Sequence, residues 1–338
     1  MKYSKNIKLN YRINTESKKI ISLLKTSDFK ESFKTINSGL EDLGEYPTHL
    51  SKLKDGRLAS CFNDGAIRIY SKNTFNCQLS IKTNLNTVYY FTQLNNGNIL
   101  TCSHDGTMKI FKLTEDNNED NKYTLEQNLT GHTKTIYKAI EIKDNVLISV
   151  SADKTMKIWN LNNNNKYECT KTINLENSNN FYNILKLNEN EFVTSLCGDK
   201  CLKFWDSNNY SNISNINNIE CIWFSRSLCK LDDDILCVGT SNSNGFYLIK
   251  TSTHQVIKNI TGPKHIWSIY KCFDGSILCS IQENNNNSLV KYKYENQNFY
   301  KIFEKENASI NRIMSCVELD DEIIAAGGYD ISIKLWRK

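Results

Sequence analysis

The sequence predicts an all-β fold, a seven-bladed β-propeller with four antiparallel strands in each blade. Three observations support this fold class. A short pattern recurs seven times at nearly constant spacing, each recurrence is surrounded by strand-like runs, and helical periodicity is absent from about residue 40 onward. At 338 residues the chain is long enough to bury a large core.

The recurring pattern is a small residue, a turn with Asp, and alternating apolar residues that end in an aromatic residue. It reads SADKTMKIW at 151–159, and related stretches stand at 62–70, 103–111, 197–205 and 328–336. Two weaker copies have Asn244 and Asn286 in the Asp position. Successive turns are 41 to 48 residues apart, a period typical of four-stranded propeller blades.

The strands of each unit follow in order. In the third unit, residues 135–142, 146–151, 155–161 and 167–175 are short runs rich in β-branched and aromatic residues, separated by polar turns. The dipeptides at 64–65 and 105–106 are Asp-Gly, which predicts two-residue hairpin turns in which Gly adopts a positive φ.

The last unit contains only three strands before residue 338. The stretch SFKTIN at 32–37 matches CTKTIN at 169–174, the fourth strand of the third unit. We therefore expect the N-terminal strand to complete the last blade and close the ring, which covers otherwise open sheet edges. The predicted organisation is a basic N-terminal extension at 1–30 and a propeller at 31–338.

These motifs resemble the WD-repeat (WD40) family of β-propellers. The third unit carries the fullest pattern, with Gly131-His132 before its first strand, Ser149, Asp153 and Trp159. The resemblance implies that His132, Ser149, Asp153 and Trp159 form a buried structural hydrogen-bond relay. Other units depart from the pattern: the Trp position holds Tyr70, Phe111 and Tyr292, and the last unit has Ala326 in the Ser position.

The distribution of charge argues against a nucleic-acid-binding surface on the main domain. Residues 1–34 carry nine Lys/Arg against three Asp/Glu, which exceeds the +5 of the whole chain, so the remainder is close to neutral. No apolar stretch is long enough to span a bilayer, and no secretory signal opens the chain. The 12 scattered cysteines are typical of a reducing compartment, so we expect a cytoplasmic protein, with the nucleus as the alternative.

No catalytic, metal or cofactor site is predicted. Cys197 and Cys201 are the closest cysteine pair, but no second Cys/His pair stands nearby. The five histidines lie apart, and no phosphate-binding loop or nucleophile elbow occurs.

The resemblance implies partner binding on the face that bears the turns between second and third strands and the loops into each first strand. The predicted partner-binding residues on this face are rich in aromatic side chains, which is typical of interface hot spots. They are Tyr46, Asn63, Tyr89, His104, Tyr137, Phe181, Trp223, His265, Trp267, Arg312, Met314 and Tyr329. The alternative for each is an alignment error of one residue, which would turn the side chain into the blade core.

The leading hypothesis is a non-enzymatic scaffold that binds protein or peptide partners, without a membrane or nucleic-acid partner. A narrower version makes it the substrate-recognition or assembly subunit of a larger complex such as a ubiquitin ligase. Two alternatives stay open: an enzyme that uses the central channel, and an RNA-associated protein that binds through the basic tail.

Overall fold

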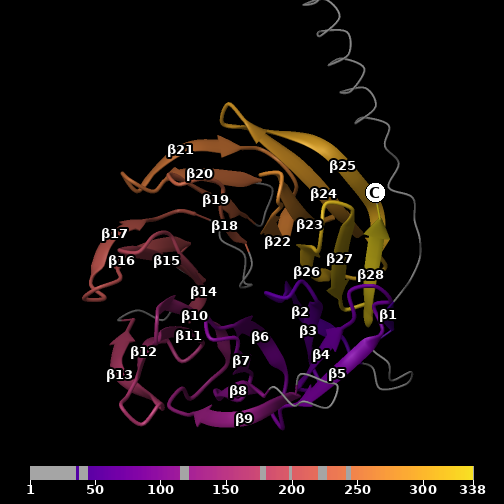
Figure 1. Cartoon of the computed structure of the whole chain (residues 1–338). Helices are drawn as coiled ribbons and strands as arrows, with labels where there is room; N and C mark the ends of the chain where they lie inside the picture. The colour runs from indigo at the N-terminus through magenta and orange to yellow at the C-terminus, as the bar shows by residue number, and fades with distance from the viewer. Residues whose placement is uncertain are drawn as a thin grey trace, which may run out of the picture.

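The computed structural model describes residues 36–37, 45–114, 122–175, 180–197, 200–219, 227–240 and 245–337. These residues form seven four-stranded antiparallel sheets that are arranged in a ring (Figure 1). The predicted seven-bladed propeller is therefore confirmed. The predicted N-terminal extension at 1–30 lies outside the described residues.

We number the blades along the chain, and in each blade the strands run from the inner to the outer side of the ring (Figure 1). Blade one consists of β2 (Pro47–Lys52), β3 (Leu58–Phe62), β4 (Ala66–Tyr70) and β5 (Cys77–Lys82), and blade two of β6 (Val88–Gln93), β7 (Ile99–Ser103), β8 (Met108–Thr114) and β9 (Lys122–Leu129). Blade three consists of β10 (Ile136–Lys143), β11 (Val146–Ser151), β12 (Thr155–Leu161) and β13 (Tyr167–Asn174), and blade four of β14 (Asn180–Lys186), β15 (Glu191–Cys197), β16 (Cys201–Asp206) and β17 (Asn212–Ile216). Blade five consists of β18 (Leu228–Lys230), β19 (Ile235–Gly239), β20 (Phe246–Lys250) and β21 (Gln255–Ile260), and blade six of β22 (His265–Lys271), β23 (Ile277–Glu283), β24 (Asn286–Glu295) and β25 (Asn298–Ser309). Blade seven consists of β26 (Ile313–Glu318), β27 (Ile323–Gly328), β28 (Ser332–Arg337) and the N-terminal β1 (Ile36–Asn37).

The composition of each strand follows its depth in the blade. The second and third strands of blade one, β3 and β4, are buried at every position, because neighbouring blades cover both of their faces. The outer strand β13 is mostly exposed and correspondingly polar. This is why the second and third strands read as apolar runs, whereas the fourth strands are the hardest to recognise.

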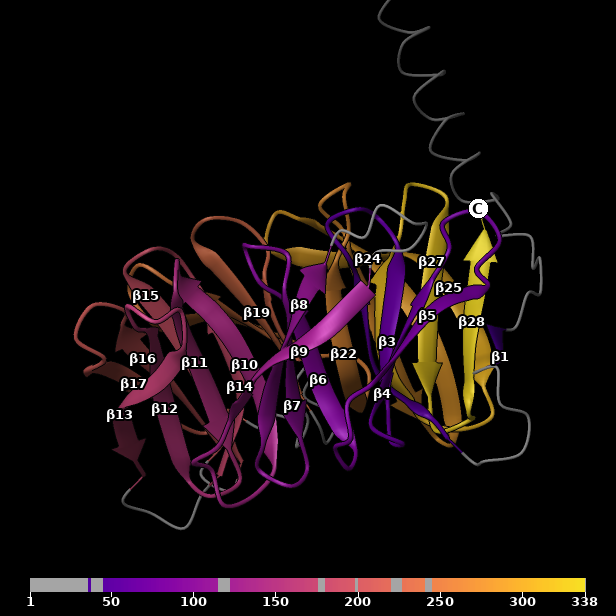
Figure 2. The same ribbon diagram turned by 60° about the horizontal axis from the view of Figure 1, so that its bottom comes forward.

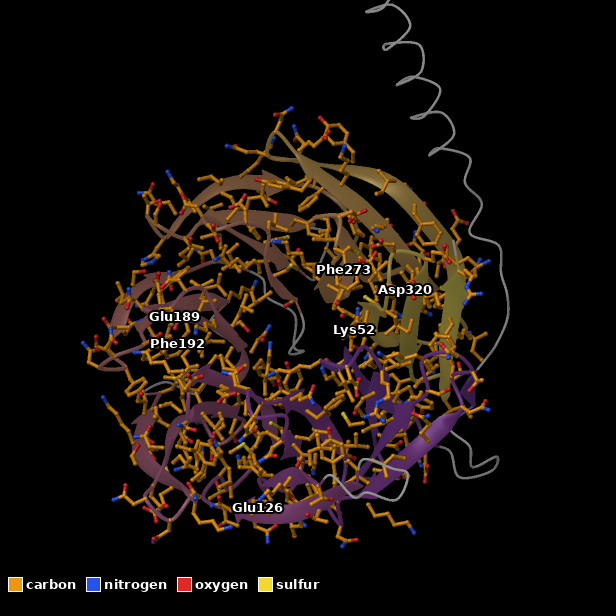
Figure 3. All side chains as sticks on the ribbon, viewed as in Figure 1. Lys52, Glu126, Glu189, Phe192, Phe273 and Asp320 are labelled. Carbon is orange, nitrogen blue, oxygen red and sulfur yellow. The ribbon has the colours of Figure 1, made fainter. Side chains whose placement is uncertain are left out.

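Packing between blades forms the core of the ring. Seven apolar clusters each join two neighbouring blades. The cluster between blades one and seven packs Leu50 and Phe62 of blade one against Val317 and Ile333 of blade seven. Phe192, labelled in Figure 3, is fully buried in the cluster between blades three and four. The ring thus has no unpaired blade face at the junction of its ends.

The N-terminal strand closes the ring as predicted. β1 pairs with β28 in antiparallel register, with Ile36 opposite Ile333 and Asn37 opposite Ser332. β1 and β28 lie side by side in Figures 1 and 2. This pairing supplies the fourth strand of blade seven, so the hydrogen-bonding edge of β28 is covered.

The predicted Asp-Gly turns are also present. Gly65 and Gly106 have φ values of 80° and 83° in the turns between the second and third strands of blades one and two. A Cβ atom on Gly65 would lie 2.1 Å from the carbonyl oxygen of Leu85, so this turn also needs glycine for close packing. Blade three has Lys154 (φ 69°) and blade seven has Ile331 (φ 56°) in this left-handed conformation.

A buried carboxylate links blades six and seven at the opposite end of the strands. Glu318 is 3 % exposed and accepts hydrogen bonds from the backbone N–H of Phe273 (2.6 Å) and from Lys291 Nζ (3.0 Å). Phe273 also contacts blade one, because Lys52 Nζ lies 4.3 Å from the centre of its ring (Figure 3). Within the described ranges there is no helix long and apolar enough to span a bilayer.

Candidate functional site

The four relay residues of blade three form one chain of hydrogen bonds. Trp159 Nε1 donates to Ser149 Oγ (2.9 Å), which contacts His132 Nε2 (2.8 Å), and His132 Nδ1 contacts Asp153 Oδ2 (2.8 Å). Because indole N–H can only donate, the serine hydroxyl is free to donate to His132 Nε2. His132 then carries its proton on Nδ1 and donates it to the carboxylate of Asp153.

Electrostatics support a neutral imidazole and an ionised carboxylate. Burial lowers the pKa of His132 below its ordinary value, although Asp153 opposes the shift. Burial acts to raise the pKa of Asp153, but hydrogen bonds from His132, Thr155 and the backbone N–H of Thr133 outweigh it and hold the pKa far below its usual range. The carboxylate is thus fully used inside the blade and is not available as a general base.

In other blades, the carboxylate in the same turn is bonded to different partners. In blade one, Arg68 is 4 % exposed and bridges Asp64 (2.7 Å) and Glu45 (3.0 Å). In blade seven, Asp330 accepts a hydrogen bond from Ser309 Oγ (2.7 Å) and pairs with Lys334 (2.9 Å). The turn carboxylates therefore have structural roles in these blades too.

The top face is defined here as the end of the ring that bears the turns between second and third strands and the loops into each first strand. In Figure 2 this end lies at the lower edge, where β27 ends and β28 begins. This is the face on which the partner-binding residues were predicted to lie.

A β-bulge in the first strand turns one aromatic side chain in several blades away from the ladder. The register shifts between Val88 and Tyr90, between Ile136 and Lys138, and between Ile266 and Ser268. The skipped residues are Tyr89, Tyr137 and Trp267. A bulge re-aims a side chain, which explains why these large residues are only half-buried within otherwise buried strands.

These residues belong to a continuous arc on five adjacent blades. The aromatic arc comprises Trp267 of blade six, Arg312 and Tyr329 of blade seven, Tyr46 of blade one, Tyr89 of blade two and Tyr137 of blade three. Each of them is partly exposed.

The contacts within the arc are close. The guanidinium carbon of Arg312 lies 3.9 Å from the centre of the Trp267 ring and 5.8 Å from that of Tyr329. Tyr329 meets Tyr46 edge to face at 4.5 Å, and Tyr89 lies 6.0 Å from Tyr137. Burial raises the pKa of Tyr46, and the neighbouring phenols Tyr329 and Tyr89 add to the shift.

Several other predicted residues flank this arc. His265 lies 6.3 Å from Trp267, and His104 lies 6.0 Å from Tyr89. Asn63 has a local structural role, because its side-chain oxygen accepts the backbone N–H of Tyr46 at 2.5 Å. Trp223 lies outside the described residues.

Two predicted residues are not on the surface. Phe181 is 0 % exposed and packs in the cluster between blades three and four, and Met314 is 3 % exposed. Phe181 occupies the buried position directly before the bulge, opposite Leu196, as Ile136 does opposite Ser151. The alignment was therefore wrong by one residue in blade four.

The bulged residue of blade four is Tyr182, which was not among the residues predicted from the sequence. The register shift lies between Phe181 and Asn183, and Tyr182 is 9 % exposed and stacks on Tyr137 at 4.4 Å. An alignment of Phe181 with the buried residues Val88 and Ile136 would have identified it. Tyr182 supports the arc from behind and presents little surface of its own.

A set of polar side chains lies beside the arc. Each of them follows the bulged residue of its strand by one position. His49 stacks on Tyr90 at 4.4 Å, and Lys138, 8 % exposed, donates to Asn183 Oδ1 (2.9 Å). Lys138 Nζ also lies 5.3 Å from the centre of the Tyr90 ring. These residues were not among those predicted from the sequence, because burial of a lysine cannot be read from its neighbours in the chain.

Two further features lie away from the arc. A hollow of about 480 Å³ on blade six is lined by Glu283, Glu304 and Glu306, with Lys301 as a cation. On the outer side of blade four, Ser214 Oγ lies 2.6 Å from His254 Nδ1, and the imidazole also pairs with Glu191 and thereby ties blade four to blade five. Among the described residues, no group of three or more His, Cys, Asp or Glu is arranged to hold a metal ion.

Comparisons with known proteins agree with this geometry. Residues 123–160 match the family model "WD domain, G-beta repeat", so the predicted WD-repeat resemblance is confirmed. A search of curated protein sequences finds no match. Among solved structures, the WD40 β-propeller domain of Doa1 is similar with a TM-score of 0.68 and 20 % identity over 90 % of this chain and 95 % of that one. A chain in the mitotic checkpoint complex has a TM-score of 0.70 and 13 % identity over 90 % of this chain and 91 % of that one.

Proposed function

We propose that this chain, a seven-bladed propeller that carries a WD40 repeat at residues 123–160, is a non-enzymatic scaffold that binds a protein or peptide segment on its top face. The observation that carries this proposal is the aromatic arc. Its rings and its guanidinium pack against one another and yet remain partly exposed on five adjacent blades.

The composition of the arc suits protein recognition. Trp, Tyr and Arg dominate interface hot spots, because they bury a large area for a small loss of side-chain entropy. The mutual packing of Trp267, Arg312 and Tyr329 restrains these side chains before a partner arrives, which reduces the entropic cost of binding. WD40 propellers are typically interaction scaffolds, and one similar structure is named for a complex.

The test compares partners that the wild-type protein captures with those captured by a triple variant, Tyr89→Ala with Trp267→Ala and Tyr329→Ala. Affinity purification with mass spectrometry should show that the variant loses the main partners, and a cooperative melting transition should show that it is still folded. Recovery of ligase subunits with the wild type would support the narrower role in a ubiquitin ligase.

A matched control removes exposed apolar surface elsewhere. Leu125, Ile213 and Tyr300 lie on the outer strands β9, β17 and β25 and are 50–51 % exposed. Their simultaneous replacement by Ala should leave the captured partners unchanged. If the arc variant and this control retain the same partners, the proposed binding face is wrong.

A further inference from the structure

We propose that the arc binds an acidic peptide segment, in which an Asp or Glu carboxylate pairs with Arg312 and a neighbouring apolar side chain packs on Ile310 and Ile331. This inference rests on the proposed function and specifies the chemistry of the partner.

Packing, rather than hydrogen bonding, holds the guanidinium of Arg312 in place. It lies over the Trp267 ring, and its Nε atom is buried without a hydrogen-bond partner. The side chain as a whole is partly exposed, and among the described residues its guanidinium forms no hydrogen bond or ion pair. Its terminal N–H groups are therefore left for a ligand, in the planar fork that matches a carboxylate.

The carboxylates next to Tyr329 and Tyr46 in the chain are already paired with other cations. Asp330, next to Tyr329, is bonded to Ser309 and Lys334, and Glu45, next to Tyr46, is bonded to Arg68. Within the described ranges Arg312 has no ion pair of its own. An external anion is thus the group that would complete its interactions.

Two exposed apolar side chains lie in the same loops. Ile310 is two residues before Arg312 and is 92 % exposed, and Ile331 is two residues after Tyr329 and is 50 % exposed. The Ser309–Asp330 hydrogen bond joins their loops. Ile331 also has a φ of 56°, an unfavourable conformation for a β-branched residue, which the bonds of Asp330 hold in place. These two side chains provide exposed apolar area in the loops that also carry Arg312 and Tyr329.

The chemistry favours a carboxylate over the alternatives. A cationic ligand would be repelled, because Arg312 already occupies the face of the Trp267 ring. A doubly charged phosphate is best held by several cations, whereas one guanidinium lies within the arc. A single carboxylate matches a single guanidinium in charge and in shape.

The experiment selects binders from a random 12-residue peptide display library on the immobilised full-length protein. We expect enriched peptides to contain Asp or Glu next to an apolar residue. Synthetic copies, labelled with fluorescein, should bind roughly 10- to 100-fold more weakly to Arg312→Gln, and Glu→Gln exchange in the peptide should have a similar effect. The two changes together should cost little more than either one alone.

Each other outcome is informative. Enriched peptides that lack acidic residues but fail to bind the triple arc variant would overturn this inference and leave the proposed function standing. Peptides that bind the triple arc variant undiminished, or no enrichment over a blank surface, would overturn both. A copy with phosphoserine in place of Glu that binds more than tenfold tighter would reassign the ligand to a phosphopeptide.

Control variants separate local pairing from overall charge. Lys134→Gln removes an exposed cation of the top face outside the arc, and Glu283→Gln removes a carboxylate of the blade-six hollow. Both should change peptide affinity less than threefold, as long-range charge effects are screened by salt. Rescue of binding by R312E with a Lys-containing copy of the peptide would establish direct contact, and melting curves would confirm that each variant is folded.

Discussion

The imidazole Nδ1 of His132 lies 2.8 Å from Oδ2 of Asp153, and this contact joins the loop before β10 to the turn between β11 and β12. It is the outer link of the relay that continues through Ser149 to the indole of Trp159. The loop before β10, strand β11, the turn that follows it and strand β12 are thereby held together by buried side chains.

Replacement of Asp153 by Ala should lower the free energy of unfolding by about 1–3 kcal/mol, because His132 loses its buried acceptor. Asp105 in blade two is the matched control. It is exposed and accepts the backbone N–H of Thr107, but it has no relay behind it. Asp105→Ala should therefore cost less than about 1 kcal/mol. Urea unfolding of the two variants makes the comparison, and equal losses would mean that the relay adds nothing beyond the turn.

The relay also predicts a pH dependence. Burial places the pKa of folded His132 below the value of about 6.5 expected in the unfolded chain, so the unfolded state binds the proton more readily. Stability from the neutral imidazole is present above about pH 6.5 and is lost as the pH falls below it. Asp153, whose pKa is held low, keeps its contribution until the pH falls below about 4.

The test compares the wild type with His132→Asn by urea unfolding at pH 7.5, 6.5 and 5.5. The gap in free energy of unfolding between them should narrow toward pH 5.5, because the penalty for protonation exists only in the wild type. A gap that widens on acidification would show that the folded protein prefers a charged imidazole at this position.

The corrected register of blade four can be tested directly. Phe181 is fully buried, so Phe181→Ala should destabilise the protein by about 3–5 kcal/mol. Tyr137, the bulged residue of blade three, is partly exposed, and Tyr137→Ala should cost less than half as much while it weakens partner capture. If Tyr137→Ala were the more destabilising change, the assignment of its ring to the surface would be wrong.

Closure of the ring by β1 predicts different outcomes for two truncations. Removal of residues 1–37 should lower the melting temperature and promote aggregation, since it exposes the edge of β28 that pairs with Ile36 and Asn37. Removal of residues 1–30 leaves β1 in place and is the control. Thermal melting and light scattering report the result, and identical behaviour of the two truncations would argue against a stabilising role for β1.

The fold could be predicted from the sequence because it is repeated. Five of the seven units carry an Asp-containing turn between two apolar strands, so the pattern around Asp153 stands out when it recurs at Asp64, Asp105 and Asp330. Closure by β1 could be predicted for the same reason, because the stretch at residues 32–37 repeats the sequence of an outer strand. The relay residues were identified through the family resemblance, and their hydrogen bonds follow from their donors and acceptors.

The candidate site was predictable only in part. Aromatic residues near each first strand indicated the top face, but a bulge shifts the two-residue alternation by one position. The alternation alone therefore could not distinguish Phe181, which is buried, from Tyr182, which stacks behind the arc.

By itself, the sequence determined the number of blades, the order of strands and the closure of the ring, because these depend on patterns local to each repeat. Only the tertiary structure decided which side chains meet across blades. Trp267 and Arg312 are 45 residues apart in the chain, and Tyr46 and Tyr329 come from its two ends, yet both pairs are in contact. Such contacts depend on how neighbouring sheets pack around the ring, which no single repeat encodes.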